Sequence, residues 1–279
     1  MTTRRWGVLA PILAPAWLWL LLFVAAPVLL VAALSFSTSV PGVPPFSPLL
    51  HDPDPANYAA LVEDGFYLRA VLKSLEVAAV ASALCLLIGY PMALAIARAS
   101  EKWRPLLLLL VMLPFWTGFL LRVTAWIGLL RDQGWVNAAL GLLGLAPVKL
   151  LYTDFAMFVG ITYAYLPFMI LPLYARLSKA DPALEEAAAD LGASPWTAFR
   201  TITWPLSLPG VVAGLALVFI PAVGEYVIPE LLGGPGAETI GRALWNEFFS
   251  NRDWPMAATV ATALLIGLLV PMVVLRARE

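Results

Sequence analysis

Six runs of mostly apolar residues dominate the sequence and limit what it can fold into. A helix that crosses a bilayer needs about 20 such residues, because a rise of about 1.5 Å per residue must cover about 30 Å of hydrocarbon. The runs cover residues 6–36, 71–97, 106–130, 155–174, 205–232 and 256–275. We therefore predict an all-α polytopic membrane protein with six transmembrane helices.

The composition excludes several other classes of protein. Hydrophobic residues make up 61% of the chain and charged residues 13%, whereas soluble domains are nearer half and a quarter. A net charge of −1 provides no basic surface for nucleic acid. With one cysteine, Cys85, and one histidine, His51, we expect no disulfide framework, no metal site and no cofactor in this chain.

The first apolar run is too long for a cleaved signal peptide. It follows Arg4 and Arg5 and extends to about Phe36, whereas the apolar part of a signal peptide has only about 7–15 residues. We therefore expect this run to be a retained first span.

We expect two domains in the chain. Residues 1–69 would form an N-terminal span and an external loop, and residues 70–276 a transmembrane domain that includes a loop at 177–204.

A polar, helix-forming insert at residues 184–196 separates the fourth and fifth apolar runs. Asp181 can cap a helix that has Pro182 at its first position, where a missing N–H costs nothing. Gly192 can adopt the positive φ that often ends a helix. The pattern predicts a short helix that ends in a sharp turn at Gly192.

A second helix is predicted directly after this turn. Ser194 followed by Pro195 repeats the cap-plus-proline pattern, and the helix should end near Thr203, before Pro205. Two helices and a turn outside the bilayer form a rigid hook, which we interpret as a surface presented to a partner.

The distribution of positive charge orients the spans. Six spans place both termini on one side, together with the 98–104 loop and the hook, and that side carries ten Lys/Arg against six on the other. The ten are Arg4, Arg5, Arg98, Lys102, Arg104, Arg176, Lys179, Arg200, Arg276 and Arg278. By the positive-inside rule, the termini and the hook are cytoplasmic.

Several charged residues fall within or at the ends of the apolar runs, where each costs at least about 2.5–3.5 kcal/mol at the bilayer centre. Glu76 has a structural explanation, since Lys73 lies three residues earlier on the same helical face. Arg122 either lines a polar path or neutralises a glutamate such as Glu225.

Glu225 is the strongest candidate for a functional charge. It lies beside Gly224, between Pro221 and Pro229, where we predict an interrupted helix. Broken spans with polar groups near the midplane are typical of transport sites.

The spacing within the hook resembles a known signature. Glu186-Ala187-Ala188, three residues, Gly192, nine residues, Ile202 and then Pro205 is similar to the loop by which ABC-importer permeases dock onto their ATPase subunits. Trp204 stands where the family usually has Leu, and we expect it to pack all the same. The resemblance implies an ATPase-coupling loop at 181–205, with coupling residues Glu185, Glu186, Ala187, Ala188, Gly192, Ile202 and Pro205.

A second resemblance concerns the substrate. Residues 224–234 are similar to the fifth span of polyamine (putrescine/spermidine) permeases, and residues 244–249 and 251–255 look closest to the putrescine member. The family implies a type I ABC importer of the inner membrane. It has two related permease subunits, two ATPase subunits and a periplasmic substrate-binding protein. The implied substrate-pathway residues are Glu225, Tyr226, Glu230 and Arg122.

The chain contains no Gly-x-x-x-x-Gly-Lys-Ser/Thr motif, so we expect no catalytic residues here, with ATP and Mg²⁺ bound by a partner ATPase. We expect membrane lipid to be a further partner. We expect no nucleic-acid partner. Two alternatives stay open: an ABC permease for another small ligand, such as an amino acid or a metal chelate, and an ion-coupled secondary transporter.

Overall fold

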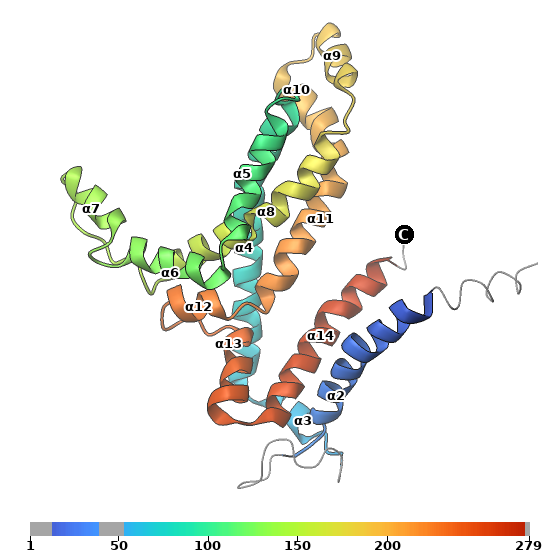
Figure 1. Ribbon diagram of the computed structural model, residues 1–279, viewed down its shortest axis with the longest axis vertical. Helices are drawn as coiled ribbons and strands as arrows, with labels where there is room; N and C mark the ends of the chain where they lie inside the picture. Colours follow the sequence, from blue (N-terminus) through green and yellow to red (C-terminus); the bar gives the residue numbers. More distant parts are fainter. Residues whose placement is uncertain (1–12, 39–52, 277–279) are drawn as a thin grey trace, which may run out of the picture. The chain divides into compact units, whose positions relative to one another are not determined.

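The computed structural model describes residues 13–38 and 53–276, and every regular element among them is a helix (Figure 1). These residues divide into two compact units. One contains the described residues of Met1–Arg69 and Ala243–Glu279, and the other contains Ala70–Arg242. The predicted all-α class is confirmed, whereas the division into domains at residue 69 stays a prediction.

The first unit pairs the first and last apolar runs. Its helices are Leu13–Leu34, which contains the π-turn η1 (Leu21–Ala25) and α2 (Ala26–Leu34), then α3 (Ala56–Glu63), the π-helix η3 (Asn246–Asn251) and α14 (Trp254–Arg276). Helix α14 packs against α2 and α3. The hydroxyl of Thr259 donates a 3.0 Å hydrogen bond to the Ser35 carbonyl, which joins α14 to the end of α2.

The second unit holds the remaining apolar runs and the hook. Its elements are α4 (Gly65–Arg98, which begins in the first unit), α5 (Arg104–Trp116), α6 (Phe119–Leu130), α7 (Trp135–Leu142), α8 (Asp154–Leu177), α9 (Pro182–Asp190), α10 (Pro195–Ala198), η2 (Phe199–Thr203), α11 (Trp204–Val223), α12 (Val227–Leu232) and α13 (Ile240–Trp245, which ends in the first unit). Its core is formed by α4, α8 and α11, whose buried side chains include Cys85, Met169, Ile170, Leu173 and Val218.

Helices α8 and α11 approach each other closely because α11 carries glycine at the contact. A Cβ added to Gly210 would lie 2.9 Å from the carbonyl oxygen of Pro172, and one on Gly214 would lie 2.6 Å from the sulfur of Met169. Small residues at such crossings let two backbones come together inside a membrane. The two helices therefore form a tightly packed pair.

Within residues 13–38 and 53–276, four helices are long and apolar enough to cross a membrane: Leu13–Leu34, Gly65–Arg98, Asp154–Leu177 and Pro195–Val223. The bent pair Arg104–Trp116 and Phe119–Leu142 is a fifth candidate. The last apolar run forms α14 (Trp254–Arg276). Six crossings therefore stay a prediction, because only the first four meet the requirement as unbroken helices.

The third predicted span differs from a single helix over 106–130. Helix α5 ends at Trp116, and the chain bends by 90° before it continues from Phe119. Thr117 and Gly118 are extended, with ψ of 140° and 141°, and the Thr117 hydroxyl donates a 2.7 Å hydrogen bond to the Pro114 carbonyl. The apolar pattern runs through this break, so hydropathy does not reveal it.

Candidate functional site

The first helix of the hook begins as its sequence predicts. The carboxylate of Asp181 accepts a 3.0 Å hydrogen bond from the backbone N–H of Ala183, and Pro182 is the first residue of α9. A side-chain acceptor at this position satisfies an N–H that has no partner within the helix.

The turn after α9 confirms the role predicted for Gly192, whose φ is +84°. Its N–H donates to the carbonyl of Ala189, and the N–H of Ala193 donates to that of Ala188, both at 2.9 Å. This pair of bonds is a Schellman motif, which requires a residue with positive φ. The direction in which the chain leaves α9 therefore depends on Gly192.

The second hook helix begins where expected but does not end there. The hydroxyl of Ser194 accepts a 3.2 Å hydrogen bond from the Thr197 N–H and caps α10. The predicted end before Pro205 is wrong, because η2 and α11 continue the helix without a break from Pro195 to Val223. The wider π-turn of η2 ends at Thr203, two residues before Pro205, and such turns accommodate a missing backbone hydrogen bond.

Glu185 ties the hook to two membrane helices. Both of its oxygens accept from Nη2 of Arg98 at the end of α4, at 2.8 and 2.7 Å. The Thr203 hydroxyl, next to the start of α11, donates to Oε1 of the same carboxylate at 2.5 Å. We call this set of contacts the clamp. The resemblance places Glu185 among the coupling residues, and its observed contacts are with side chains of this same chain.

The clamp is ionised at neutral pH. The hydrogen bond from Thr203, together with Arg98, lowers the pKa of Glu185 below its ordinary value, although partial burial opposes the shift. Because the pKa in the folded protein is lowered, the clamp stabilises the hook above the ordinary glutamate pKa. This contribution is lost as the pH falls through the lowered value.

The hook also carries apolar side chains that the sequence reasoning did not single out. Leu191 is 89% exposed, Trp196 69% and Leu184 46%. Glu186 and Ala187 are exposed beside them. Large apolar side chains on a polar loop outside the bilayer are unusual, and such exposed patches mark interaction surfaces. We call Leu184, Leu191 and Trp196 the apolar face of the hook.

The remaining signature positions lie at the base of the hook. Ile202 is partly buried and Pro205 is exposed. Trp204 packs as expected, with its ring centroid 5.3 Å from that of Tyr90 on α4 and 6.4 Å from that of Phe199. An aromatic residue therefore fills the place of the usual leucine.

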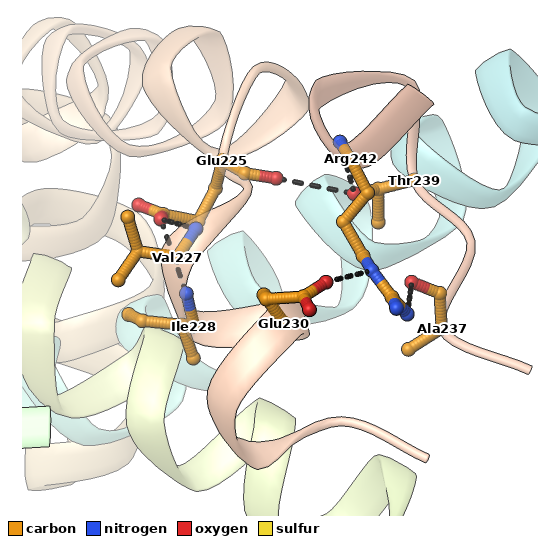
Figure 2. A network of polar contacts seen from close by, with 7 residues as sticks. All are labelled: Glu225, Val227, Ile228, Glu230, Ala237, Thr239 and Arg242. Carbon is orange, nitrogen blue, oxygen red and sulfur yellow. Dashed lines mark hydrogen bonds and ion pairs between the residues drawn. The ribbon is translucent and has the colours of Figure 1, made fainter. Parts of the chain in front are cut away.

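The predicted interruption of the fifth span is confirmed. Helix α11 ends at Val223, and α12 begins at Val227. Glu225, in the break, is only 9% exposed. Its Oε1 accepts from the backbone N–H groups of Val227, at 2.9 Å, and Ile228, at 3.3 Å (Figure 2). The carboxylate thus satisfies the first N–H groups of α12, which have no partner within that helix.

A second helix supplies the other partner of this carboxylate. The hydroxyl of Tyr165 on α8 donates a 2.6 Å hydrogen bond to Oε2 of Glu225. Sixty residues separate the two in sequence, so no local pattern predicts this pair. With 20 residues, α11 extends about 30 Å at 1.5 Å per residue. The break therefore lies at the end of α11 that is remote from the hook.

Glu230 and the segment before α13 surround the break (Figure 2). Nε of Arg242 donates to Glu230 at 2.6 Å, and Nη1 of the same arginine donates to the carbonyl of Ala237 at 3.1 Å. The Thr239 hydroxyl donates to the carbonyl of Glu225 at 3.2 Å. Glu230 is 47% exposed, so it faces the surroundings while it neutralises Arg242.

Arg122 does not neutralise Glu225. Across residues 13–38 and 53–276 the structure contains no ion pair or hydrogen bond between the two. The Arg122 guanidinium carbon instead lies 5.1 Å and 5.6 Å from the ring centroids of Phe115 and Phe119. Tyr226, the fourth predicted pathway residue, is partly buried beside Glu225.

Glu76 has the structural partner that its spacing predicts. Nζ of Lys73 lies 3.4 Å from its carboxylate, and Lys73 also pairs at 3.6 Å with Asp154 at the start of α8. In the described part of the chain, no group of three or more His, Cys, Asp or Glu is placed to hold a metal.

Comparison with known proteins identifies relatives over most of the chain. Residues 85–276 match the family described as binding-protein-dependent transport system inner membrane component. The spermidine/putrescine transport system permease PotB of Haemophilus influenzae is 40% identical over 250 residues, which cover 89% of this chain and 86% of that protein. The Escherichia coli K12 protein of the same name is 39% identical, with 89% of each covered.

Two further proteins also match: a relative named for another substrate, and a transporter whose structure is solved. The molybdenum transport system permease ModB of Mycobacterium bovis is 34% identical over 214 residues, 74% of this chain and 76% of that protein. A bacterial ABC transporter that imports the polysaccharide alginate superposes with a TM-score of 0.68 over 96% of this chain and 93% of its own, at 22% identity. The last match shows a shared fold.

The clamp generates a prediction about the mobility of the hook. Glu185→Gln removes the charge that Arg98 binds. Both side chains are partly exposed, 55% for Arg98 and 37% for Glu185, so the loss should be about 0.5–1 kcal/mol. We expect amide hydrogen exchange in residues 181–205 to become about two- to fivefold faster, as measured by mass spectrometry.

Glu186→Gln is the matched control, since it makes the same change one residue along α9 at an exposed side chain. Its exchange rates should equal those of the wild-type protein. Equal rates in the two variants would show that Glu185 does not hold the hook.

Proposed function

The chain belongs to the family of inner-membrane components of binding-protein-dependent transport systems, and on that premise we propose that it is one of two permease subunits of an ATP-driven polyamine importer. It would form half of the translocation pathway. A second homologous permease, two ATPase subunits and a periplasmic substrate-binding protein would complete the transporter. ATP and Mg²⁺ would bind to the ATPase subunits.

The observation that carries this proposal is a rigid hook with an exposed apolar face. Leu191 and Trp196 are 89% and 69% exposed, and the Schellman turn at Gly192 fixes the direction of the chain between them. A partner that covers these side chains gains the free energy of burying them, about 25 cal/mol per Å². Since the chain lacks a nucleotide-binding motif of its own, a separate ATPase is the partner that the proposal requires.

Two neighbouring features give the hook a means to act on the membrane helices. The clamp connects α9 to the ends of α4 and α11, and α11 continues from the hook to the break at Glu225. A movement imposed by the ATPase on the hook would reach both helices. We assign coupling to Glu185, Glu186, Ala187, Ala188, Gly192, Ile202 and Pro205.

The choice of a polyamine rests on the relatives and on the charge at the break. The relatives that are 39–40% identical over 89% of the chain are named for spermidine and putrescine transport. Glu225 keeps acceptor capacity, since Oε2 accepts one hydrogen bond from Tyr165 and a carboxylate oxygen has about two acceptor sites. An ammonium group about 4 Å away gains roughly 4 kcal/mol at an effective dielectric constant of about 20.

Residues near Glu225 would help it to bind the ammonium groups of the polyamine. Tyr226 directly follows it, and an aromatic face holds an ammonium group with about 0.5–2 kcal/mol. Glu230, half-exposed beside Arg242, adds a second carboxylate near the break. We propose Glu225, Tyr226 and Glu230 as residues of the pathway.

A permease for another small ligand is the second candidate, because a molybdenum permease is 34% identical to this chain. Molybdenum is carried in solution as an oxyanion, which a buried carboxylate at the break would repel. Glu225 therefore favours a cation. A panel of amines, amino acids and oxyanions offered to the partner binding protein distinguishes the two candidates.

The charge distribution supports a cytoplasmic location for both termini and the hook. Arg98, Arg104 and the hook lie at the same end of the second unit, where Arg98 contacts Glu185. Glu225 would then lie towards the periplasmic end of α11, where a binding protein releases its ligand.

The docking role of the hook predicts the effect of Gly192→Val. A β-branched residue at φ of +84° is strained, so the turn should open and the apolar face should lose its shape. We expect ATPase that co-purifies with the detergent-solubilised transporter to fall at least about tenfold, with the level of inserted permease unchanged.

Gly144→Val is the matched control, because Gly144 also has a positive φ, +72°, and no atom within 4 Å of an added Cβ. Gly144 lies outside the hook, so the Gly144→Val transporter should retain its co-purifying ATPase. Normal ATPase retention in Gly192→Val would contradict the docking model.

The proposed role of Glu225 predicts the effect of Glu225→Gln. The amide oxygen can still accept from the N–H groups of Val227 and Ile228, and its NH₂ can donate to Tyr165, so the local hydrogen bonds are kept while the charge is lost. We expect radiolabelled putrescine or spermidine uptake to fall at least about tenfold, with ATPase association unchanged.

Tyr165→Phe is the control for geometry. It removes the 2.6 Å hydrogen bond and keeps the charge, so uptake should fall much less than in Glu225→Gln. Full uptake in Glu225→Gln would remove Glu225 from the pathway, and an equal loss in both variants would assign the effect to the shape of the break.

A further inference from the structure

A pocket lies beside the bend between α5 and α6. Its volume is about 420 Å³, and its walls include Leu121, Arg122, Ala125 and Trp126 of α6 and Tyr163 of α8. Glu225 is not among the residues that line it. The pocket is therefore separate from the break proposed above for the substrate, and it has a different electrostatic character.

Arg122 brings an uncompensated positive charge to this pocket. Its Nε and Nη1 atoms are buried, and neither makes a hydrogen bond within the described part of the chain. The rings of Phe115 and Phe119 lie near the guanidinium, at 5.1 and 5.6 Å. Aromatic faces attract the cation but leave its N–H donors without acceptors. Arg122 as a whole is partly buried, and guanidinium N–H donors that are shielded from water are stabilised when an anion accepts from them.

The surroundings of the pocket are apolar and exposed. Trp116 is 80% exposed, Leu120 61% and Leu121 71%. Such side chains around a charged group are typical of a helix at the boundary of a bilayer, where apolar groups enter the acyl region and arginine reaches the headgroups. Trp126 and Tyr163, whose ring centroids are 5.5 Å apart, are residue types enriched at that boundary.

The position along the chain agrees with this boundary. Helix α5 has 13 residues and extends about 20 Å from its charged start at Arg104. The chain then turns by 90°, so α6 runs across the direction of α5 (Figure 1). A helix that crosses most of a hydrocarbon core of about 30 Å and then turns sideways places its next residues near the opposite headgroups.

We propose that this pocket binds the phosphate group of a membrane phospholipid through Arg122. The guanidinium presents several N–H donors to phosphate oxygens, a geometry that lysine lacks. Trp126, Tyr163 and Leu121 contact the glycerol and the first acyl carbons. The bound lipid stabilises the bend at Thr117 and Gly118 and neutralises Arg122.

Native mass spectrometry of the assembled transporter tests this assignment. The transporter is purified in detergent after reconstitution in phosphatidylcholine with added phosphatidylglycerol, and retained phospholipids are counted. Arg122→Gln should retain one phospholipid fewer per permease copy than the wild-type protein, and Arg122→Lys should retain it partially. Ala125→Phe, which fills the pocket from its exposed wall with Arg122 intact, should lose the same phospholipid.

Arg131→Gln is the control for general attraction, because Arg131 is an exposed cation directly after α6, and its phospholipid count should equal that of the wild-type protein. An equal count in wild type, Arg122→Gln and Ala125→Phe would overturn the proposal. Release of the lipid by excess inorganic phosphate would assign the pocket to free phosphate. A carbodiimide cross-link from Arg122→Lys to the second permease would assign Arg122 to a carboxylate of that subunit, and would also overturn the proposal.

Discussion

The interaction between Glu185 and its two partners connects the part of the chain outside the bilayer to the part inside it. One carboxylate receives Arg98 from the end of α4 and Thr203 from the base of α11. The helix from Pro195 to Val223 has 29 residues and is about 44 Å long at 1.5 Å per residue. It begins in the hook and ends two residues before Glu225. A continuous helix therefore joins the exposed apolar face to the break, and α8 packs against this helix at Gly210 and Gly214.

The free energy of burying charge explains how the far end of this helix is built. Glu225 is 9% exposed, and an isolated carboxylate in such a place would be neutralised. Two backbone N–H groups of α12 and the hydroxyl of Tyr165 stabilise it. Helix α12 in turn begins where it does because Glu225 accepts from its first N–H groups. Arg122 has no comparable set of partners within the described residues. The charge of Glu225 is therefore stabilised by its own chain, whereas the charge of Arg122 requires a ligand.

The sequence predicts those features that depend on a few neighbouring residues. The caps at Asp181 and Ser194, the positive φ of Gly192 and the interruption at Glu225 are all local, and the structure contains each of them. Features that depend on distant residues were missed. The contacts of Glu185 with Arg98 and of Glu225 with Tyr165 join residues 87 and 60 positions apart. The apolar pattern does not predict the break at Thr117 and Gly118, because the apolar residues continue through it. Pro114 is a local indication of this break, since proline disturbs the hydrogen bonds of a helix.

Cysteine cross-linking tests most directly whether the hook docks onto a separate ATPase. Leu191→Cys places a thiol on the apolar face, in a chain whose buried Cys85 is replaced by alanine, and Leu142→Cys places one on an equally exposed residue of α7. In native membranes labelled with a maleimide–benzophenone reagent and then irradiated, so that the partner needs no thiol, Leu191→Cys should form a conjugate with an ATP-binding polypeptide, and Leu142→Cys should not. A conjugate from Leu142→Cys alone, or from neither position, would contradict the account.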